Sequence, residues 1–359
     1  MSTNPTSSPE RDAGLRFDME RDLLCTANAD GYFTSLNTGW ERVLGWTREE
    51  LKSRPFIDFV HPSDRERTLE QSARVSHRDY EFVNFENRYR AKGGTWRWLR
   101  WNARSDGSTW FAVAFDVTEE KERERRLRRS LTDEYLLAYS QPIVEQWDGS
   151  VAQEELLVRM RAPSEEGGIL TPDEFLPDAE RYGLISVVDR WMVSRGVAMA
   201  LRGRRAEVNL SAQSIGDADF AAELEEAVMR AGSAAENLIL EITETAALEH
   251  LDAAREFAVR LTRLGCRFAL DDFGTGFGSL THLRRLPVRY LKIDSSFVQN
   301  IVHDVEDQGL VRGIVAIARE LGVLTVGEGV EDEGTLSLLR ESGVDYAQGF
   351  LLGCPAPLD

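Results

Sequence analysis

The sequence predicts an α+β domain followed by an α/β barrel of the TIM-like (β/α)8 type, and two patterns carry this prediction. In residues 22–117, short strand-like runs are separated by Gly-containing turns and short helical stretches. From Tyr135 onward, strand-like runs alternate with helical runs, which indicates parallel strands joined by helical crossovers. Eight such strands in roughly 220 residues predict a closed barrel.

The bulk composition is that of an ordinary folded, acidic protein. A chain of 359 residues with 42% hydrophobic residues can form two or three domains with a substantial core. The formal charge of -18 argues against binding of duplex nucleic acid through its phosphates. Cys25, Cys266 and Cys354 lie far apart, which is not the spacing of a disulfide framework or a zinc site and fits a reducing compartment.

The sequence shows no sign of a membrane segment. No apolar run approaches the roughly 18 residues of a membrane span. The first residues are rich in Ser, Thr and Pro and lack the charged and apolar parts of a signal sequence. We therefore expect a cytoplasmic protein whose residues 1–18 form a disordered tail.

The first domain is expected to begin with a hairpin around Asp30-Gly31. A helix over residues 40–44 follows, and Thr47 and Glu50 form the capping-box pattern that opens another helix. A further helix is predicted from residue 62 to about residue 76, with Ser63 as its N-cap. The expected strands cover residues 23–27, 32–36, 80–90, 96–103 and 110–117.

This order of elements resembles a PAS sensor domain, which we place at residues 19–118. The resemblance rests on the segments 45–51 (GWTREEL), 60–64 (VHPSD), 92–98 (KGGTWRW) and 116–118 (DVT). It implies a domain that senses a small ligand, light or redox state through the cavity of its sheet, or that only dimerises.

The sequence leaves the ligand of the PAS domain open. The chain lacks the Asn-Cys-Arg-Phe-type segment of the photoreactive flavin-binding subclass, and Cys25 on an early strand is interpreted as a core residue. A haem would need an axial ligand such as histidine, but His61 lies in a turn and His77 near a helix end. A non-covalent flavin, another small molecule and no ligand are the remaining alternatives.

Residues 119–133 are predicted to form a helical signalling linker, because they contain helix formers and neither Gly nor Pro. Val117, Leu127 and Leu131 give only a sparse apolar stripe, which is too thin for a clear coiled coil. The helix is either a solvated connector or a signalling helix that pairs two subunits. The PAS resemblance favours the second interpretation.

The barrel domain is expected to span residues 134–359. Its strands are predicted at 136–144, 154–161, 206–211, 238–243, 266–271, 290–294, 324–327 and 347–350, and its helices at 173–181, 220–231, 251–264, 310–321 and 333–341. Active sites of such barrels lie at the C-terminal strand ends. Polar residues recur there, namely Glu155, Arg159, Asn209, Glu241, Asp271, Asp272, Lys292, Asp294, Glu328 and Gln348. Residues two apart on a strand share a face, so Leu157 lies on the face of Glu155 and Arg159.

These residue types predict a metal-dependent reaction on a phosphate ester. Asp271 and Asp272 alone would most simply be a polar turn, but many carboxylates on one rim repel one another and favour a cation among them. Oxygen ligands without His or Cys select Mg²⁺ or Mn²⁺ over zinc. Two such ions are a device for phosphodiester hydrolysis. In such a reaction Lys292 would orient the water or stabilise charge, and Glu328 would accept the proton of the water or hold a metal-bound water. The guanidinium of Arg159 is suited to bind the phosphate.

The second domain resembles the EAL family of cyclic di-GMP phosphodiesterases across about residues 136–357. The motif that names the family is present as 155–159 (ELLVR). It is followed by 172–180 (PDEFLPDAE), 209–211 (NLS), 241–244 (EITE), 271–280 (DDFGTGFGSL), 292–294 (KID), 328–331 (EGVE) and 348–349 (QG). The resemblance implies hydrolysis of cyclic di-GMP to linear pGpG with two ions of Mg²⁺ or Mn²⁺.

The resemblance also implies roles for individual residues. One metal ion would be bound by Glu155, Asn209, Glu241 and Asp271, and a second by the bridging Asp271 with Asp272. Lys292 and Glu328 would be catalytic. The substrate or its water would be contacted by Gln141, Leu157, Arg159, Glu331 and Gln348. Glu244 would anchor the loop 271–280, which in the family couples dimerisation to the site.

Several positions depart from the family pattern. Leu156 replaces the central Ala of the name motif and should point away from the site by strand alternation. Met160 stands where an aromatic residue is common, and Gly327 replaces a usual Ala. Phe277-Gly278 replaces a Tyr-Ser pair, and the glycine would loosen that loop.

The resulting hypothesis is an active phosphodiesterase controlled by the PAS domain and by formation of a homodimer. The main alternative is a non-hydrolysing cyclic di-GMP receptor that acts through a partner. The altered loop keeps this alternative open, whereas intact Glu155, Lys292 and Glu328 disfavour it. A third alternative, an inert barrel, would predict loss of metal ligands, and none of the identified positions is lost.

Overall fold

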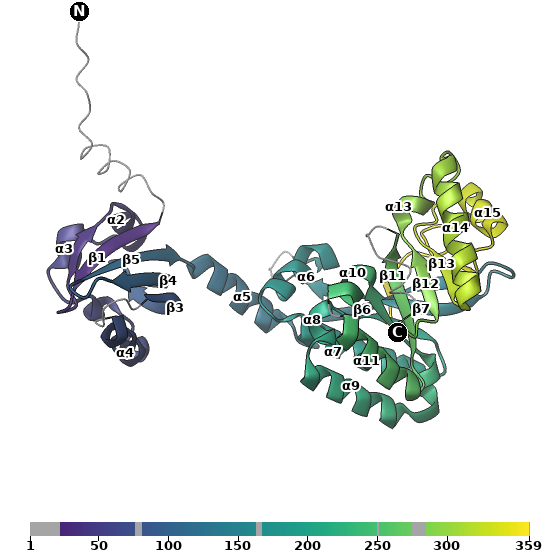
Figure 1. Cartoon of the computed structure of the whole chain (residues 1–359), viewed down its shortest axis with the longest axis horizontal. Helices are drawn as coiled ribbons and strands as arrows, with labels where there is room; N and C mark the ends of the chain where they lie inside the picture. The colour runs from purple at the N-terminus through teal and green to yellow at the C-terminus, as the bar shows by residue number, and fades with distance from the viewer. Residues whose placement is uncertain (1–21, 76–80, 163–166, 250, 275–284, 359) are drawn as a thin grey trace, which may run out of the picture. The chain divides into compact units, whose positions relative to one another are not determined.

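The computed structural model describes residues 22–75, 81–162, 167–249, 251–274 and 285–358 (Figure 1). The chain divides into two compact units, Met1–Arg126 and Leu127–Asp359, which we describe one at a time. Among the described residues, no helix combines the length and the apolar character that crossing a membrane requires.

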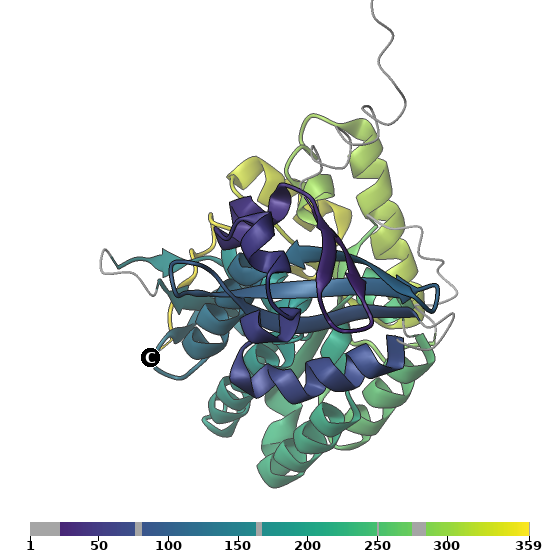
Figure 2. The same ribbon diagram turned by 90° about the vertical axis from the view of Figure 1, so that its left-hand side faces the viewer.

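The first unit is built on a five-stranded antiparallel sheet with helices packed beside it (Figure 2). Its strands stand in the order β2-β1-β5-β4-β3, with bounds Phe33–Leu36, Leu23–Asn28, Thr109–Asp116, Trp96–Ser105 and Glu81–Arg90. The helices between β2 and β3 are α2 (Gly39–Leu44), α3 (Arg48–Lys52) and α4 (Arg65–Val75). Aromatic side chains of helix and sheet form the core, where the rings of Trp40 and Trp101 lie 5.5 Å apart. The predicted α+β domain is confirmed.

Two predictions for helix starts in this unit had different outcomes. The capping box is confirmed, because the side chain of Thr47 accepts a hydrogen bond from the N–H of Glu50 and the Glu50 carboxylate accepts one from the N–H of Thr47. Ser63 is not the N-cap. The chain starts a 3-10 turn at Pro62–Asp64, and Nδ1 of His61 accepts from the N–H of Ser63 at 3.2 Å. The proline at the first position fixes where this turn begins.

Helix α5 (Thr118–Ser130) shows that residues 119–130 of the predicted linker are helical, whereas residues 131–133 follow the end of the helix. Its first half packs on the sheet of the first unit, where Lys121 forms an ion pair with Glu86 at 2.8 Å. Farther along, Leu127 is 7% exposed and belongs with Leu131 to the hydrophobic core of the second unit. The apolar stripe that the sequence assigned to pairing of subunits is therefore buried within one chain.

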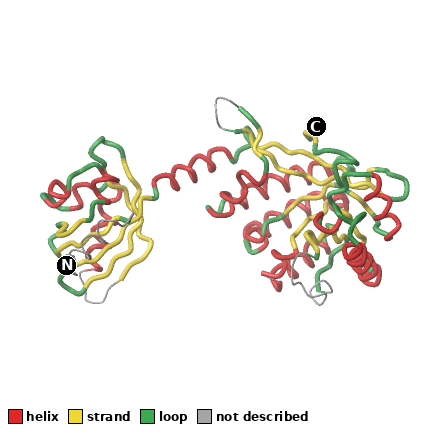
Figure 3. The backbone as a smooth tube through the Cα atoms, turned by 90° about the horizontal axis from the view of Figure 1, so that it is seen from above, coloured by secondary structure: helices red, strands yellow, loops and turns green. Residues whose placement is uncertain are grey.

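The second unit is a closed barrel of eight strands flanked by helices (Figure 3). The strands follow one another in the order β6-β14-β13-β12-β11-β10-β9-β7, and β7 pairs with β6 to close the barrel. Their bounds are β6 Leu136–Glu145, β7 Val151–Arg161, β9 Ala206–Asn209, β10 Leu238–Thr243, β11 Arg267–Phe273, β12 Tyr290–Ile293, β13 Leu324–Gly327 and β14 Tyr346–Ala347. The short strands β8 (Ile169–Leu170) and β15 (Ala356–Pro357) pair with β7 and β6.

The described helices of this unit include every helix that the sequence predicted and four that it did not, three of which are short. They are α6 Pro172–Arg181, α7 Ile185–Leu201, α8 Ala212–Ile215, α9 Ala218–Ala231, α10 Glu244–Glu249, α11 Leu251–Arg263, α13 Ser295–Val298, α14 Val305–Leu321 and α15 Glu333–Ser342. The longer helix that was not predicted is α7. It buries one face, but its outer face also carries apolar residues such as Val187 and Leu201, so its sequence lacks the one-sided apolar period of a surface helix.

The first strand of the barrel runs against the predicted direction. β6 is antiparallel to both β7 and β14, whereas the six successive pairs from β7 round to β14 are parallel. Only residues 146–150 join β6 to β7, and a parallel crossover needs about a dozen residues. The chain therefore turns back as a hairpin, and no crossover helix follows β6.

Strand alternation divides the side chains of the barrel between two cores. An interior layer contains Ile143, Ile239, Ala269, Tyr290 and Val326. A larger cluster lies between the strands and the helices, and Leu156 belongs to it with an exposed fraction of 1%. Leu156 therefore points away from the interior, as predicted, and its neighbours Glu155 and Leu157 point to the other face of β7.

We expect Leu127→Ala to destabilise the second unit, because it removes a buried side chain from the core. The free energy of unfolding should fall by about 2–5 kcal/mol, which is typical of such a truncation. Urea unfolding of the full chain, followed by fluorescence, measures this change. The control is Leu69→Ala on α4, where the side chain is 52% exposed and the change should stay below about 0.5 kcal/mol. Unchanged stability together with an altered oligomeric state would instead show that Leu127 pairs subunits.

Candidate active site

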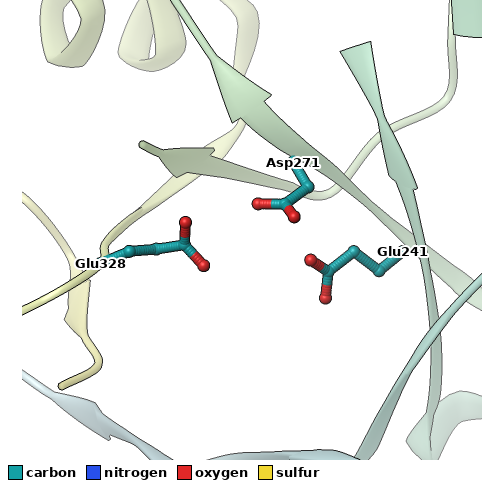
Figure 4. Close-up of side chains that lie close together, drawn as sticks. All are labelled: Glu241, Asp271 and Glu328. Carbon is teal, nitrogen blue, oxygen red and sulfur yellow. The ribbon is translucent and has the colours of Figure 1, made fainter. Parts of the chain in front are cut away.

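The C-terminal ends of the barrel strands bring together carboxylates from different strands. Glu241 lies on β10, Asp271 on β11 and Glu328 directly after β13. Figure 4 shows these three carboxylates facing one another. One oxygen of each lies within 4.8 Å of an oxygen of both others. Acids that are far apart in the sequence thus meet at one rim of the barrel.

The ammonium group of Lys292 on β12 lies at the centre of the acidic cluster. Its Nζ is 2.6 Å from Glu241, 2.8 Å from Glu328, 3.4 Å from Glu155 and 3.7 Å from Asp271. Lys292 is only 1% exposed. Burial alone would lower its pKa, but the surrounding carboxylates raise the pKa well above its usual value. The lysine is therefore charged, and one positive charge faces four acids.

Amide side chains hold Glu155 from two sides. Asn209 on β9 donates from Nδ2 to Glu155 Oε1 at 2.8 Å, and Gln348 after β14 donates from Nε2 to Oε2 at 2.7 Å. Gln348 also donates to Oε1 of Gln141 at 3.2 Å, and Gln141 donates to the carbonyl of Gly353 at 3.0 Å. Gln141 stands directly opposite Glu155 in the β6–β7 ladder. The hairpin is thus what brings Gln141 to the site.

An irregularity in β11 lets two adjacent aspartates serve the same site. Neighbouring residues of a strand normally point to opposite faces. Asp272, however, has a φ of 55°, in the left-handed region, and the pairing of β11 with β12 shifts its register here. Oxygens of Asp272, Asp294 and Glu328 form a second group within 4.8 Å of one another. Glu328 belongs to both groups, which links the position of Asp271 to that of Asp272.

The electrostatics of the site fit divalent cations. Burial raises the pKa of Glu241 well above its usual value, and the carboxylate of Asp271 raises it further. Burial also raises the pKa of Glu328 to about 8, although Lys292 opposes this shift. Among the described residues, Glu241 Oε2, Asp271 Oδ1 and Gln348 Oε1 are buried without a hydrogen-bond donor. Buried acceptors without donors are suited to bind an ordered water or a cation, and an all-oxygen set fits Mg²⁺ or Mn²⁺.

Three other predicted site residues have contacts or exposure of their own. Arg159 on β7 donates to the carbonyl of Val158 at 2.8 Å, and its guanidinium lies 5.6 Å from the ring centroid of Tyr139. Leu157 is half-buried on the same strand, and Glu331 is exposed after β13. Within the described part of the chain, neither Arg159 nor Glu331 forms an ion pair with the acidic cluster. Both are at liberty to contact a substrate.

Glu244 begins α10 beside the start of the loop that follows β11. Its Oε2 accepts a long hydrogen bond from the N–H of Gly274 at 3.4 Å, and the side chain is buried. This contact is the one expected of a residue that anchors the loop 271–280. Phe277 and Gly278 lie outside the described residues, so the effect of their replacement stays a prediction.

Sequence reasoning missed Glu207, which lies beneath the site. It is 0% exposed on β9, and its Oε2 accepts a hydrogen bond from Nε2 of Gln153 at 2.8 Å. Burial raises the pKa of Glu207 to about 7, against the attraction of Lys292. Strand alternation was the available signal, because Glu207 shares a face with Asn209 and Gln153 shares one with Glu155.

The first unit encloses a small apolar cavity of about 60 Å³. Cys25 lines it and belongs to the core as predicted, and burial raises the pKa of its thiol. His61 does not line it, and its ring lies 4.5 Å from that of Trp96. Small-molecule sites usually measure about 300–1,000 Å³. The cavity in this form has room for a very small ligand but not for a flavin or a haem.

A closed barrel with a charged site at its C-terminal strand ends is the architecture of an α/β-barrel enzyme. The EAL domain family matches residues 124–355, and the PAS fold family matches residues 33–109. The chain belongs to the EAL domain family and carries a PAS fold ahead of that domain.

Individual relatives agree with this assignment. The chain is 39% identical over 249 residues to the cyclic di-GMP phosphodiesterase NbdA of Pseudomonas aeruginosa, which covers 67% of this chain and 32% of that protein. It is 36% identical over 239 residues to the cyclic di-GMP phosphodiesterase PdeF of Escherichia coli, covering 65% and 32%. The match thus spans about a third of the length of these relatives.

Solved structures show the same barrel with a ligand. The PaMucR phosphodiesterase in complex with c-di-GMP is 35% identical, with a TM-score of 0.62 over 66% of this chain and 98% of that one. The FimX EAL domain of Pseudomonas aeruginosa bound to c-di-GMP is 28% identical, with a TM-score of 0.61 over 66% and 96%.

Glu207→Gln is expected to flatten the pH dependence of stability. A carboxyl with a pKa of about 7 in the folded chain and about 4.3 in the unfolded chain holds its proton only in the folded state between these values. The contribution of Glu207 to stability should therefore fall as pH rises through this window, by up to about 4 kcal/mol, and its loss is complete above about pH 7. The variant should lack this part of the fall, while Glu241 and Glu328, whose pKa values are also raised, should keep theirs.

Urea unfolding at about pH 5 and about pH 8, in EDTA, measures the effect of Glu207→Gln. The matched control is Glu223→Gln, whose side chain is 59% exposed and which should keep the slope of the unchanged protein. Equal slopes for the unchanged protein and Glu207→Gln would show that Glu207 is ionised in the folded state.

Proposed function

We propose that the chain is a metal-dependent phosphodiesterase that hydrolyses cyclic di-GMP to linear pGpG. The observation that carries this proposal is the set of carboxylates around Lys292, whose buried oxygens include acceptors without donors among the described residues. The relatives named as cyclic di-GMP phosphodiesterases indicate the substrate. Both parts are needed, because a metal site alone fits phosphodiesters in general.

Two groups of oxygen ligands are proposed to hold two ions of Mg²⁺ or Mn²⁺. The first group consists of Glu155, Asn209, Glu241 and Asp271. The second consists of Asp271 and Asp272, with Asp294 and Glu328 beside Asp272. When bound, such ions activate water and neutralise charge on the phosphate. Neither group contains a histidine or a cysteine, which favours these hard ions over zinc.

Lys292 and Glu328 are proposed to be the catalytic residues. A carboxyl with a pKa of about 8 exchanges its proton near neutral pH, so Glu328 can take the proton of the attacking water. The ammonium of Lys292 stabilises the negative charge that develops on the phosphate. The water oxygen bonds to one phosphorus, and the bond from that phosphorus to the 3′ oxygen breaks. The 3′ oxygen takes up a proton from solvent, and the ring opens to pGpG.

The residues around the cluster are proposed to bind the substrate. The guanidinium of Arg159 uses one donor on the carbonyl of Val158 and has others for a phosphate. Gln141 and Gln348 are buried beside Glu155 and fix the edge of the site. Leu157 and Glu331 would complete the contact with the dinucleotide.

Control by the PAS domain and by a homodimer is the second part of the proposal. Helix α5 supports it, because a single helix contributes Lys121 to contacts of the first unit and Leu127 to the core of the second. A change in the first unit that moves Lys121 acts on the same rigid element that holds Leu127. Glu244 adds a contact with Gly274, through which the loop after β11 can respond to formation of the dimer.

Glu155→Gln is expected to abolish hydrolysis of cyclic di-GMP by the purified chain in Mg²⁺ or Mn²⁺. The amide keeps the size of the side chain but removes the charge that faces Lys292 and the proposed ion, so kcat should fall by at least about 100-fold. Chromatography of pGpG measures turnover. EDTA should abolish turnover of the unchanged protein.

The matched control for Glu155→Gln is Glu154→Gln. Glu154 is the preceding residue of β7, points to the opposite face and pairs with Arg204 at 2.5 Å, so its loss should leave kcat within about twofold. Turnover that persists in Glu155→Gln or in EDTA would contradict the metal site. Tight binding of intact cyclic di-GMP without turnover by the unchanged protein would establish the receptor alternative.

Removal of residues 1–117 tests the proposed regulation. This deletion keeps all of α5, so that Leu127 stays in the core of the barrel. We expect kcat to change by about fivefold or more and the dimer to be lost. Size-exclusion chromatography with light scattering and the pGpG assay measure the two effects. Removal of residues 1–18 is the control, and identical behaviour of all three proteins would rule out control by the PAS domain.

A further inference from the structure

A carboxylate outside the proposed metal site holds the part of the chain that carries one of the metal ligands. Asp189 lies on α7 and is 5% exposed. Its Oδ2 accepts a hydrogen bond from the N–H of Ser211 at 3.0 Å and another from the hydroxyl of Ser211 at 2.7 Å. Asp189 therefore fixes the backbone two residues beyond Asn209, which is one of the proposed ligands.

The strand that ends at Asn209 is paired on only one side at that point. β9 has four residues, and its pairing with β7 ends one residue before Asn209. On the other side Asn209 pairs with Glu241, and the N–H of Leu210 donates to the carbonyl of Glu241 at 2.9 Å. The next backbone hydrogen bond to another element is the one from Ser211 to Asp189. The end of β9 is thus held by β10 and by a single side chain of α7.

Close packing does not replace this contact. A cavity of about 550 Å³ lies beside residues 209–213, and Asp189 lines it as well. Side chains that border such a space have no packing partners on that side. Helix α8, which follows with Ser211 as its N-cap, has four residues and is too short to hold itself in place. The position of Ser211 relative to α7 therefore depends on its hydrogen bonds to Asp189.

The orientation of the Asn209 side chain is what this position controls. Its Nδ2 donates to Oε1 of Glu155 at 2.8 Å, which makes the amide oxygen the atom available to a cation. A shift of the backbone after Asn209 moves both the donor to Glu155 and this oxygen. Groups that orient metal ligands in this way typically contribute 10- to 100-fold to metal affinity or activity.

We propose that Asp189 is a positioning residue of the metal site and acts through Ser211 on Asn209. Its carboxylate fixes the backbone after β9 and so sets where the amide of Asn209 meets Glu155 and an ion of Mg²⁺ or Mn²⁺. Asp189 itself contacts neither the ion nor the substrate. The inference rests on the proposed function in one respect, namely that Asn209 and Glu155 are ligands of the ion.

Titration of the full chain with Mn²⁺ alone tests this role without any need for catalysis. Free Mn²⁺ is measured by its electron paramagnetic resonance signal. Asp189→Ala removes the acceptor of both bonds from Ser211, and we expect the Kd for Mn²⁺ to rise by about tenfold or more. Asp189→Asn keeps an oxygen that can accept both bonds, so the rise should stay below about threefold. Equal Mn²⁺ affinity of Asp189→Ala and the unchanged protein would overturn the proposal.

Asp345→Ala is the matched control, because Asp345 makes the same pair of bonds elsewhere. Its Oδ2 accepts from the N–H of Thr325 at 2.8 Å and from the hydroxyl of Thr325 at 2.9 Å. These bonds lie where β13 and β14 begin, at the opposite end of the strands from the carboxylates. Both variants should lower the free energy of unfolding, but only Asp189→Ala should weaken Mn²⁺ binding. An equal loss of Mn²⁺ affinity in both would show a general effect of stability and overturn the proposal.

Ser211→Ala decides the question if Asp189→Ala fails to fold. It removes the hydroxyl bond to Asp189 and leaves the backbone bond, so the Kd for Mn²⁺ should rise by about threefold. Ser211→Thr keeps a hydroxyl and should retain the affinity of the unchanged protein. Undiminished affinity in Ser211→Ala would overturn the proposal.

The assay of cyclic di-GMP hydrolysis separates positioning from a direct role in the reaction. At limiting Mn²⁺, Asp189→Ala should have a lower kcat and an unchanged KM, and excess Mn²⁺ should restore kcat to within about twofold. A loss of kcat that excess Mn²⁺ does not restore would overturn the proposal. An unchanged protein that binds Mn²⁺ without turnover would overturn the proposed function and leave the titration result intact, whereas one that does not bind Mn²⁺ would overturn both.

Discussion

The buried ammonium of Lys292 is the interaction on which the site of the barrel depends. Four carboxylates from β7, β10, β11 and the end of β13 lie 2.6–3.7 Å from it. Without a cation among them these acids would repel, so the lysine is what allows four strands to end in carboxylates in one folded chain. One ammonium does not compensate four carboxylates, and burial with the neighbouring acids raises the pKa values of Glu241 and Glu328. The acids that are costly to bury are therefore the same acids that are suited to bind further cations.

Two departures from regular barrel geometry complete the site. The antiparallel β6 places Gln141 opposite Glu155 in a ladder, and Gln348 can then bond to both side chains. A parallel β6 would set a different register and separate these groups. At β11, the left-handed backbone of Asp272 turns a second carboxylate toward Glu328. A residue in this conformation is strained by about 1–3 kcal/mol, and such strain persists where the surroundings hold it in place.

The sequence predicted the elements that depend on local periodicity, but it did not predict the features that tertiary contacts determine. β10 (Leu238–Thr243) has the predicted bounds, because an apolar run ends there in polar residues. Helix α7 was missed because it is apolar on several sides. Glu207 was missed because a single acid within a short strand is usually interpreted as an exposed residue at the edge of a sheet. The short connection 146–150 indicates a hairpin between β6 and β7. The prediction of a parallel β6 instead followed the alternation of strands and helices in the rest of the domain. Aspartate adopts a positive φ more readily than most residues, but nothing in the sequence distinguishes Asp272 from Asp271 in this respect.

Helix α5 shows how a very polar segment becomes ordered. It has 13 residues, about the length at which an isolated helix is marginal in water, and most of them are charged. Its order therefore comes from contacts outside the helix. In the first unit, Trp98 lies within 5.9 Å of Lys121 and 5.3 Å of Arg125, and in the second unit Leu127 is buried in the core. Because the two sets of contacts stabilise the same hydrogen-bonded turns, loss of either set weakens the other.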